Sequence, residues 1–404
     1  MAQCRHREAC RDDVLKERLR SELAVTVTGA ASYATGTFLP YIAPLLIEEF
    51  ITRFELKPQI AGAIATGQFL LLSLSGLVVA SMSDRIDARK TAILGAVLSA
   101  GGCLFALLAN GVFAVSSALV LAYLGQGISG VSAYGIALAA KRPARSVAIM
   151  TSTGYLYGAI WLYVIPAMEI RHIGAHPTML ACAVGAIATC AVVLAGIGFV
   201  PSRQPTEPQP ATAERGPLGR LSAVLLGSDM VVFAGGAAIW TFSVEIAKRT
   251  GMGLEVIGMV LSAAAIAGVI GPILVTVLRA RYGLNAISAA ALTFYVAGCF
   301  ITGAGINAVT FSLAFLAISI VQGLLNPLVF EIGLHVDPTG RTSGSTYSFM
   351  FFGYALGPLI GGLAFGISSY SLGWASSAAA LAGALGVGWV LLRVALPSKD
   401  LRSR

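Results

Sequence analysis

Long apolar runs separated by short polar stretches dominate the chain. Runs of about 20 or more mostly apolar residues recur at 23–49, 59–83, 90–110, 112–139, 146–169 and 178–200, and again at 221–247, 253–278, 285–306, 308–334, 344–367 and 370–396. A helix needs about 20 such residues to cross the hydrocarbon core of a bilayer. The pattern therefore predicts an all-α membrane protein with twelve transmembrane helices.

The longest internal polar stretch divides these runs into two sets of six. Its sequence, PSRQPTEPQPATAERGPLGR, is rich in Pro, Gln, Glu and Thr and predicts a flexible linker. We therefore expect a tail, a six-helix bundle, a linker, a second six-helix bundle and a tail, at 1–22, 23–200, 201–220, 221–396 and 397–404. Within the first tail, residues 11–22 predict a short amphipathic helix along the membrane surface.

Lys and Arg lie mostly on one side of the predicted membrane. If the N-terminus is cytoplasmic, the cytoplasmic segments hold 22 of the 27 Lys and Arg residues and the outer loops hold five. Positive residues concentrate on the cytoplasmic side of membrane proteins. The count predicts that both termini are cytoplasmic.

Composition supports a lipid environment and excludes other classes. Only 11% of the 404 residues are charged and 56% are hydrophobic. The net charge of +8 lies in short clusters that suit anionic lipid headgroups, so we expect no nucleic-acid partner. The six cysteines predict neither a disulfide framework nor a metal site.

The two sets of six runs resemble each other. A shift of 196 residues lays Gln126-Gly127 on Gln322-Gly323, and a shift of 199 lays GYLYG (154–158) on a similar GYALG. One offset that serves several helices is typical of a structural repeat. We expect two pseudo-symmetric bundles.

The stretch ASMSDRIDARK, residues 80–90, places a dense charged segment between the second and third runs. It resembles the loop signature of the major facilitator superfamily, Gly-x-x-x-Asp-Arg-x-Gly-Arg-Arg. Asp84, Arg85 and Arg89 match this pattern, whereas Ala80 and Asp87 depart from it. Together with twelve runs and a central linker, the match identifies the chain as similar to transporters of this family.

The resemblance implies a gate. Asp84 is expected to face the start of the run 344–367, where Arg341 lies, because helix N-termini favour negative charge. With Arg85 and Arg89 it would form a charge network that breaks when the two halves rock. The alternative is that these charges only follow the positive-inside rule.

A glycine motif resembles that of proton-driven drug antiporters, but at another place. GYALGPLIGG (353–362) has the full pattern, with Gly357 and Pro358 at its centre. It lies in the eleventh run, whereas those antiporters carry it in the fifth. Tyr123 occupies the position at which they have an arginine. The likeness to drug:proton antiporters is therefore loose. We interpret the motif as a gating pivot packed tightly against the run 253–278.

Aromatic and amide side chains recur on single faces of the runs that line the central path in this family. They predict a polar, uncharged substrate site, and the alternative for some of them is a belt at the membrane interface. The predicted substrate-binding residues are Tyr33, Thr37, Tyr41, Tyr123, Gln126, Tyr155, Trp161, Trp240, Gln322, Asn326 and Tyr354.

Ionisable residues within apolar runs are candidates for proton transfer. We assign this role to Glu331, His335 and Asp229, although Glu331 and His335 could equally pair with loop arginines. Glu245 lies near the outer end of its run. Because we find no Lys or Arg deep in a run, a multiply charged anion is an unsuitable substrate.

These observations predict a secondary transporter that works by alternating access on a small neutral, amphipathic or weakly cationic molecule. Proton-coupled export is favoured. The alternatives are uptake of a small metabolite such as a monocarboxylate, and a membrane sensor or assembly factor that transports nothing. The sequence has no Gly-x-x-x-x-Gly-Lys-Ser/Thr loop and no plausible catalytic set. We expect no enzyme activity and no cofactor, and we expect a monomer.

Overall fold

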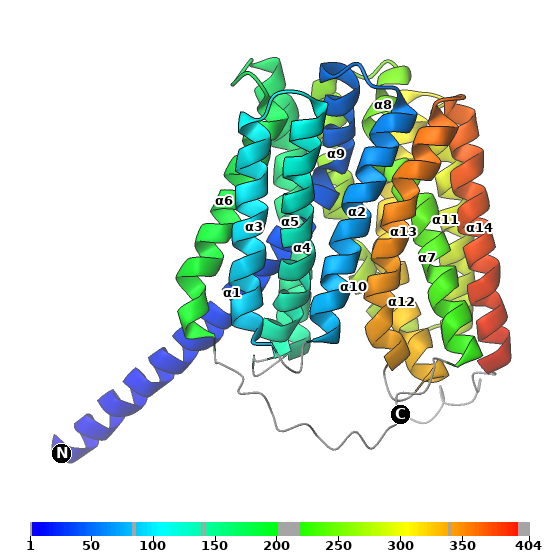
Figure 1. The fold of residues 1–404 in the computed structure, drawn as a ribbon. Helices are drawn as coiled ribbons and strands as arrows, with labels where there is room; N and C mark the ends of the chain where they lie inside the picture. The colour runs from blue at the N-terminus through cyan, green and yellow to red at the C-terminus, as the bar shows by residue number, and fades with distance from the viewer. Residues whose placement is uncertain are drawn as a thin grey trace.

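In a computed structural model, the structure describes residues 2–82, 86–138, 140, 143–200, 219–337 and 341–394. All regular elements in these ranges are helices. Most of them run roughly parallel to one another, from one end of the molecule to the other (Figure 1). Eleven helices of the described chain are long and apolar enough to cross a membrane. Predicted elements in 201–218 and 397–404, and predicted gate residues Asp84 and Arg85, lie outside the described residues.

The first set of runs forms seven elements in chain order. They are α1 (Ala2–Arg53), α2 (Pro58–Ser81), α3 (Ala88–Leu108), α4 (Val112–Leu138), α5 (Pro143–Ile170), α6 (Pro177–Gly196) and the short 3₁₀ helix η1 (Ile197–Phe199). Proline at the first position of α2 and α6 suits a helix start, because the missing N–H is one that no helical carbonyl would accept. Asp87 caps α3 by accepting a hydrogen bond of 2.9 Å from the Arg89 backbone N–H.

The second set forms eight helices. They are α7 (Arg220–Thr241), α8 (Ser243–Arg249), α9 (Leu254–Gly268), α10 (Ile270–Arg279), α11 (Leu284–Ala304), α12 (Ala308–Val336), α13 (Arg341–Phe365) and α14 (Ser369–Val394). Asn307 caps α12 by accepting a hydrogen bond from the Thr310 N–H at 2.8 Å. Gly305 ends α11 in the left-handed conformation, which favours glycine.

Two of the apolar runs and the predicted surface helix differ from their predicted form. The run 253–278 is broken between α9 and α10, because Pro272 has no N–H for the Gly268 carbonyl. The run 221–247 is broken at Phe242, where the Ser243 hydroxyl donates to the Trp240 carbonyl oxygen at 2.8 Å. Residues 11–22 form no separate helix but continue into α1.

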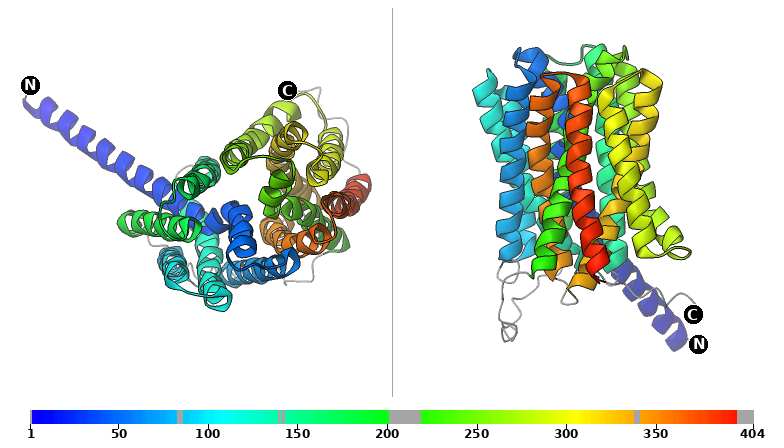
Figure 2. Two further views of the ribbon diagram at one scale, coloured as in Figure 1. Left: turned by 90° about the horizontal axis from the view of Figure 1, so that it is seen from above. Right: turned by 90° about the vertical axis from the view of Figure 1, so that its right-hand side faces the viewer.

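Seen from above, the helices form two groups (Figure 2, left). One group contains α1 to α6 and the other α7 to α14. The two groups meet chiefly where α2 packs on α13 and α5 packs on α9. We call the end where α7 begins and α14 ends the proximal face, and the end where α1 ends and α2 begins the distal face.

Small residues set the closest approaches between the groups. A side chain at Gly62 on α2 would overlap the Pro358 carbonyl on α13, and one at Gly258 on α9 would press on Pro166 of α5. Both glycines lie in the distal part of their helices. The two groups are therefore in tight contact toward the distal face.

Candidate functional site

A cavity with aromatic, aliphatic and polar side chains in its wall lies where the two groups of helices meet. The volume open to the centre of a water molecule inside it is about 80 Å³. This is several times the roughly 10–15 Å³ that a cavity needs to hold one water. Among the described residues, no charged side chain lines it. Eight of the predicted substrate-binding residues line it, from α1, α5, α7, α12 and α13: Tyr33, Thr37, Tyr41, Tyr155, Trp240, Gln322, Asn326 and Tyr354.

Helical spacing brings polar groups to the cavity from both sides. On α1, Tyr33, Thr37 and Tyr41 follow one another at intervals of four and share one face. On α12, Gln322 and Asn326 have the same spacing, so that amides and hydroxyls face each other across the cavity. Such an arrangement can bind a molecule that has both donors and acceptors of hydrogen bonds.

Glycines of α5 make room for the α1 tyrosines. A side chain at Gly154 would overlap the Tyr33 ring, and one at Gly158 would overlap the Tyr41 ring. Because both glycines lie on one face, α5 docks closely against α1 and presents Tyr155 to the cavity. The repeat GYLYG thus positions an aromatic wall, in which the Tyr41 and Tyr155 rings are 5.3 Å apart.

The opposite wall is also aromatic and is held by hydrogen bonds. The Gln322 amide nitrogen donates to the Tyr354 hydroxyl, which joins α12 to α13. The Tyr354 ring stacks on Phe233, with centroids 6.1 Å apart. The indole N–H of Trp240 donates to the Pro40 carbonyl oxygen at 3.0 Å, which joins α7 to α1. Polar atoms of the walls are therefore fixed before any molecule binds.

Three predicted substrate-binding residues lie outside this cavity. Tyr123 is buried against Phe69, with ring centroids 5.4 Å apart. Trp161 packs on Phe38, with ring centroids 5.9 Å apart. Gln126 is fully buried, faces a smaller hollow between α4, α2 and α13, and has no partner for either end of its amide.

The predicted gating residues are only partly described. Arg89 lies in the first turn of α3, and the side chain of Arg341 lies outside the described residues. The prediction that the glycine motif packs against the run 253–278 is wrong. Gly357 packs on Ala237 of α7, and Pro358 meets Gly62 of α2. These glycines face α7 because α13 lies between α7 and α2.

The predicted proton carriers lie in different surroundings. Arg279 makes a bidentate ion pair with Glu331. The arginine Nη2 lies 2.5 Å from Oε1, and Nε donates to Oε2 at 3.2 Å. His335 is exposed, and its Nδ1 lies 2.9 Å from the Glu331 carbonyl oxygen. Asp229 is 2% exposed, and its Oδ1 has no hydrogen-bond partner among the described residues. The ion pair with Arg279 agrees with the alternative prediction for Glu331, which was pairing with an arginine and not proton transfer.

Sequence reasoning missed an acidic pair at the distal end of α1. Glu48 Oε1 lies 2.6 Å from the Lys248 Nζ of α8, so this contact joins the two groups of helices. Burial lowers the pKa of Lys248, but the hydrogen bond and charge of Glu48 outweigh this effect and raise it. Glu245, which the sequence placed near the outer end of its run, lies 3.5 Å from the same Nζ.

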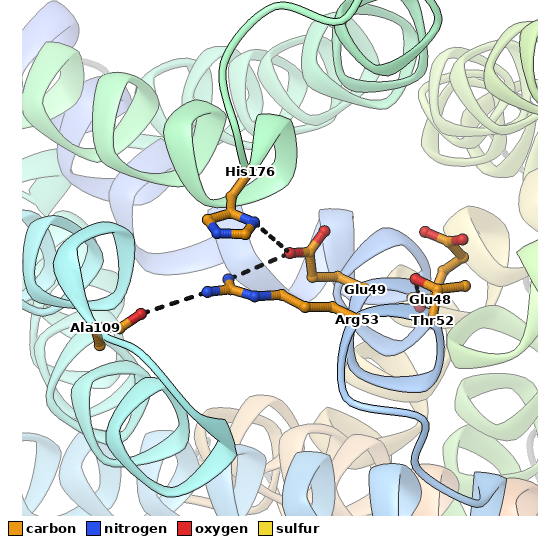
Figure 3. A network of polar contacts seen from close by, with 6 residues as sticks. All are labelled: Glu48, Glu49, Thr52, Arg53, Ala109 and His176. Carbon is orange, nitrogen blue, oxygen red and sulfur yellow. Dashed lines mark hydrogen bonds and ion pairs between the residues drawn. The ribbon is translucent and has the colours of Figure 1, made fainter.

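The neighbouring Glu49 makes contacts within its own group (Figure 3). Its Oε1 lies 3.4 Å from Arg53 Nη1 and 3.9 Å from His176 Nδ1. Arg53 also donates to the Ala109 carbonyl oxygen at 3.4 Å. A signal for this network was present in the sequence. Glu48 and Glu49 are adjacent acids at the end of the run 23–49, and Arg53 follows Glu49 by four residues.

Comparison with known proteins agrees with this architecture. The family model described as Major Facilitator Superfamily matches residues 23–361. The chain belongs to this family. A search among proteins with curated functions finds no match. Metal-ligating side chains form no group of three or more in the part of the chain that the structure describes.

Several solved structures share the fold. The nucleoside transporter NupG is 12% identical with a TM-score of 0.69, and the match covers 92% of this chain and 99% of that chain. The peptide transporter POT in complex with sulfate is 14% identical with a TM-score of 0.73, over 93% and 95% of the two chains. At such identity the likeness shows the fold alone. The protein is a multi-pass membrane protein with a transporter fold.

Proposed function

We propose that this protein is a secondary transporter that moves a small, uncharged, amphipathic organic molecule by alternating access. The observation that carries this proposal is the cavity between the two groups of helices, which is lined by rings, amides and hydroxyls without a charged side chain. A charged substrate would lose its hydration there without gaining a counter-charge. A weak cation remains acceptable, because aromatic faces attract it.

The names of the structural neighbours sharpen the substrate class. One is a nucleoside transporter and another a peptide transporter. Nucleosides carry no charge, whereas peptides have two charged ends. The uncharged cavity favours a molecule of the first kind, planar enough to lie between Tyr155 and Tyr354 and able to bond with the Gln322 and Asn326 amides.

The organisation we propose has twelve spans in two bundles, at 23–200 and 221–396, joined by the linker 201–220. Helix α5 is the twelfth span, whereas α7 with α8 and α9 with α10 each form one broken span. Both termini are cytoplasmic in an inner membrane, because the proximal side carries most Lys and Arg. The protein acts as a monomer, with 1–22 and 397–404 as tails.

We further propose proton-coupled export, with Asp229 as the carrier of the proton. Its burial and its unpartnered oxygen support this choice, because an ionised carboxylate without a partner is costly in such a place. Uptake of a small metabolite through the same cavity is the second candidate, since Tyr123 is a fully buried packing residue where antiporters have an arginine.

The experiment uses purified protein in liposomes that contain a pH-sensitive dye. Nucleosides, neutral aromatic amides, organic cations and monocarboxylates are added under an imposed proton gradient, with the Asp84→Asn and Asp229→Asn variants beside the parent. We expect proton flux with an uncharged compound, lost in Asp229→Asn, and its sign gives the direction. If labelled substrate equilibrates without proton flux, coupling is wrong. If nothing moves, the transport proposal fails.

Replacing Gln322 tests the cavity itself. Gln322→Leu removes the amide that faces the substrate and bonds to Tyr354, so we expect the substrate KM to rise about 2- to 12-fold, the equivalent of one net hydrogen bond. The control is Gln68→Leu, at another buried glutamine that does not line the cavity. A sensor or assembly factor would keep its activity in both variants.

A further inference from the structure

Trp240 closes the cavity at its distal end. It lies in the last turn of α7 and is half-buried. It lines the cavity together with Pro40 and Tyr41, which are the most distal of the α1 residues that line it. Its ring stacks on Phe315 of α12 at 5.6 Å, with 15° between the planes. The ring is thus supported from one group of helices and reaches toward the other.

The acceptor for Trp240 exists because of a proline. In an α-helix the Pro40 carbonyl would accept the backbone N–H of residue 44, but Pro44 has no N–H, and its ring pushes this carbonyl off the helix axis. The indole N–H of Trp240 donates to the same oxygen at 3.0 Å. Trp240 therefore replaces the donor that α1 lacks.

The second contact between the same helices repeats this spacing. Trp240 and Pro40 are 200 positions apart, as are Lys248 and Glu48. Eight residues of helix separate the two contacts, which is about 12 Å. The chain of α7 breaks at Phe242 between Trp240 and Lys248.

We propose that Trp240 is the distal lid of the substrate cavity and that Pro44 is the positioning residue that holds the lid shut by keeping the Pro40 carbonyl free. In the conformation described, the lid is closed. When the distal face opens, the indole leaves Pro40, and the cavity gains access to that face. The proposal concerns how the two helix groups open and needs no knowledge of the substrate.

The test measures the distance across the distal face. Spin labels are placed at Lys57 and Glu255, both exposed near the distal ends of the two groups, in full-length protein whose six native cysteines are replaced. Trp240→Phe keeps an aromatic ring against Phe315 and removes the N–H together with the five-membered ring that carries it. Pro44→Ala returns a backbone N–H that draws the Pro40 carbonyl back into the helix.

We expect Trp240→Phe to raise the ratio of distal-open to distal-closed molecules roughly 2- to 12-fold, the equivalent of one net hydrogen bond. Pro44→Ala shifts it in the same direction but less, because a carbonyl oxygen can accept two donors. The double variant shifts it no more than Trp240→Phe alone, because both changes remove one contact.

Pro40→Ala is the matched control. It makes the same replacement one turn earlier on α1 but leaves Pro44 and the Pro40 carbonyl position in place, so we expect the parent distances. Parent-like distances in Trp240→Phe, or additive shifts in the double variant, would overturn the proposal. Melting curves of each variant confirm that the distances come from folded protein, and a shift equal in Pro40→Ala and Pro44→Ala would also contradict it.

Discussion

The two ends of the molecule are held together differently. At the distal face, hydrogen bonds and ion pairs cross between the helix groups, as Glu48 does to Lys248. At the proximal end, two of the described side-chain contacts stay within one group. Thr342 donates to Ser222 at 2.7 Å between α13 and α7, and Arg279 binds Glu331 between α10 and α12.

This difference teaches which end must break for the cavity to change sides. Contacts within a group move with that group as a rigid body, whereas contacts between groups have to be replaced. The structure is closed at the distal face by the Gly62 approach, the Trp240 bond and the Glu48 ion pair.

The largest expected effect comes from filling the closest distal approach. In Gly62→Val the side chain overlaps the Pro358 carbonyl, and overpacking of this kind costs about 1–3 kcal/mol. We expect the distal-closed population to fall roughly 5- to 150-fold, with a matching loss of transport. Gly67→Val, on the same helix with open space around it, serves as control. Equal transport in both variants would show that this approach does not limit closure.

A smaller effect is expected from the ion pair. Glu48→Lys places two positive charges together, and we expect it to open the distal face by about 1–2 kcal/mol, less than a fully buried pair because Lys248 is 35% exposed. Exchanging both residues, Glu48→Lys with Lys248→Glu, should restore part of the closure. Label distances across the distal face measure both, and an exchange that opens the face further would contradict a specific pair.

The smallest effect on opening belongs to the proximal end. Thr342→Val removes the bond to Ser222, and because the bond lies within one group, the distances across the distal face should stay as in the parent. Only the stability should fall, by about 1 kcal/mol, as a melting curve can show. A change in the distal distances would mean that this contact senses the state of the gate.

Much of the fold was predictable because lipid imposes long apolar helices. Each of the twelve predicted runs is helical within the described residues, and most ends agree to a few positions, as for 59–83 and the observed Pro58–Ser81. The exception is the first run, predicted to begin at residue 23, because α1 begins at Ala2. The breaks at Phe242 and Val269 were not predicted. One depends on a serine hydroxyl and the other on Pro272, and a hydropathy pattern registers neither.

The candidate site was predictable as far as helix faces go. Spacing placed Tyr33 with Tyr41, and Gln322 with Asn326, on common faces, and these faces meet in the cavity. Spacing alone does not say which neighbour a face meets, so Gln126 points into a separate hollow. Contacts such as Trp240 with Pro40 join residues 200 positions apart and depend on how the groups pack.

The most direct test of alternating access compares the two faces in the same molecules. Label pairs at Lys57 and Glu255 report the distal face, and pairs at Met82 and Arg281 report the proximal face, all at exposed positions. The account predicts that Gly62→Val lengthens the distal distance while the proximal distance shortens. If both distances stay fixed, or if both lengthen together, the helix groups do not rock about the cavity, and the proposed transport mechanism is wrong.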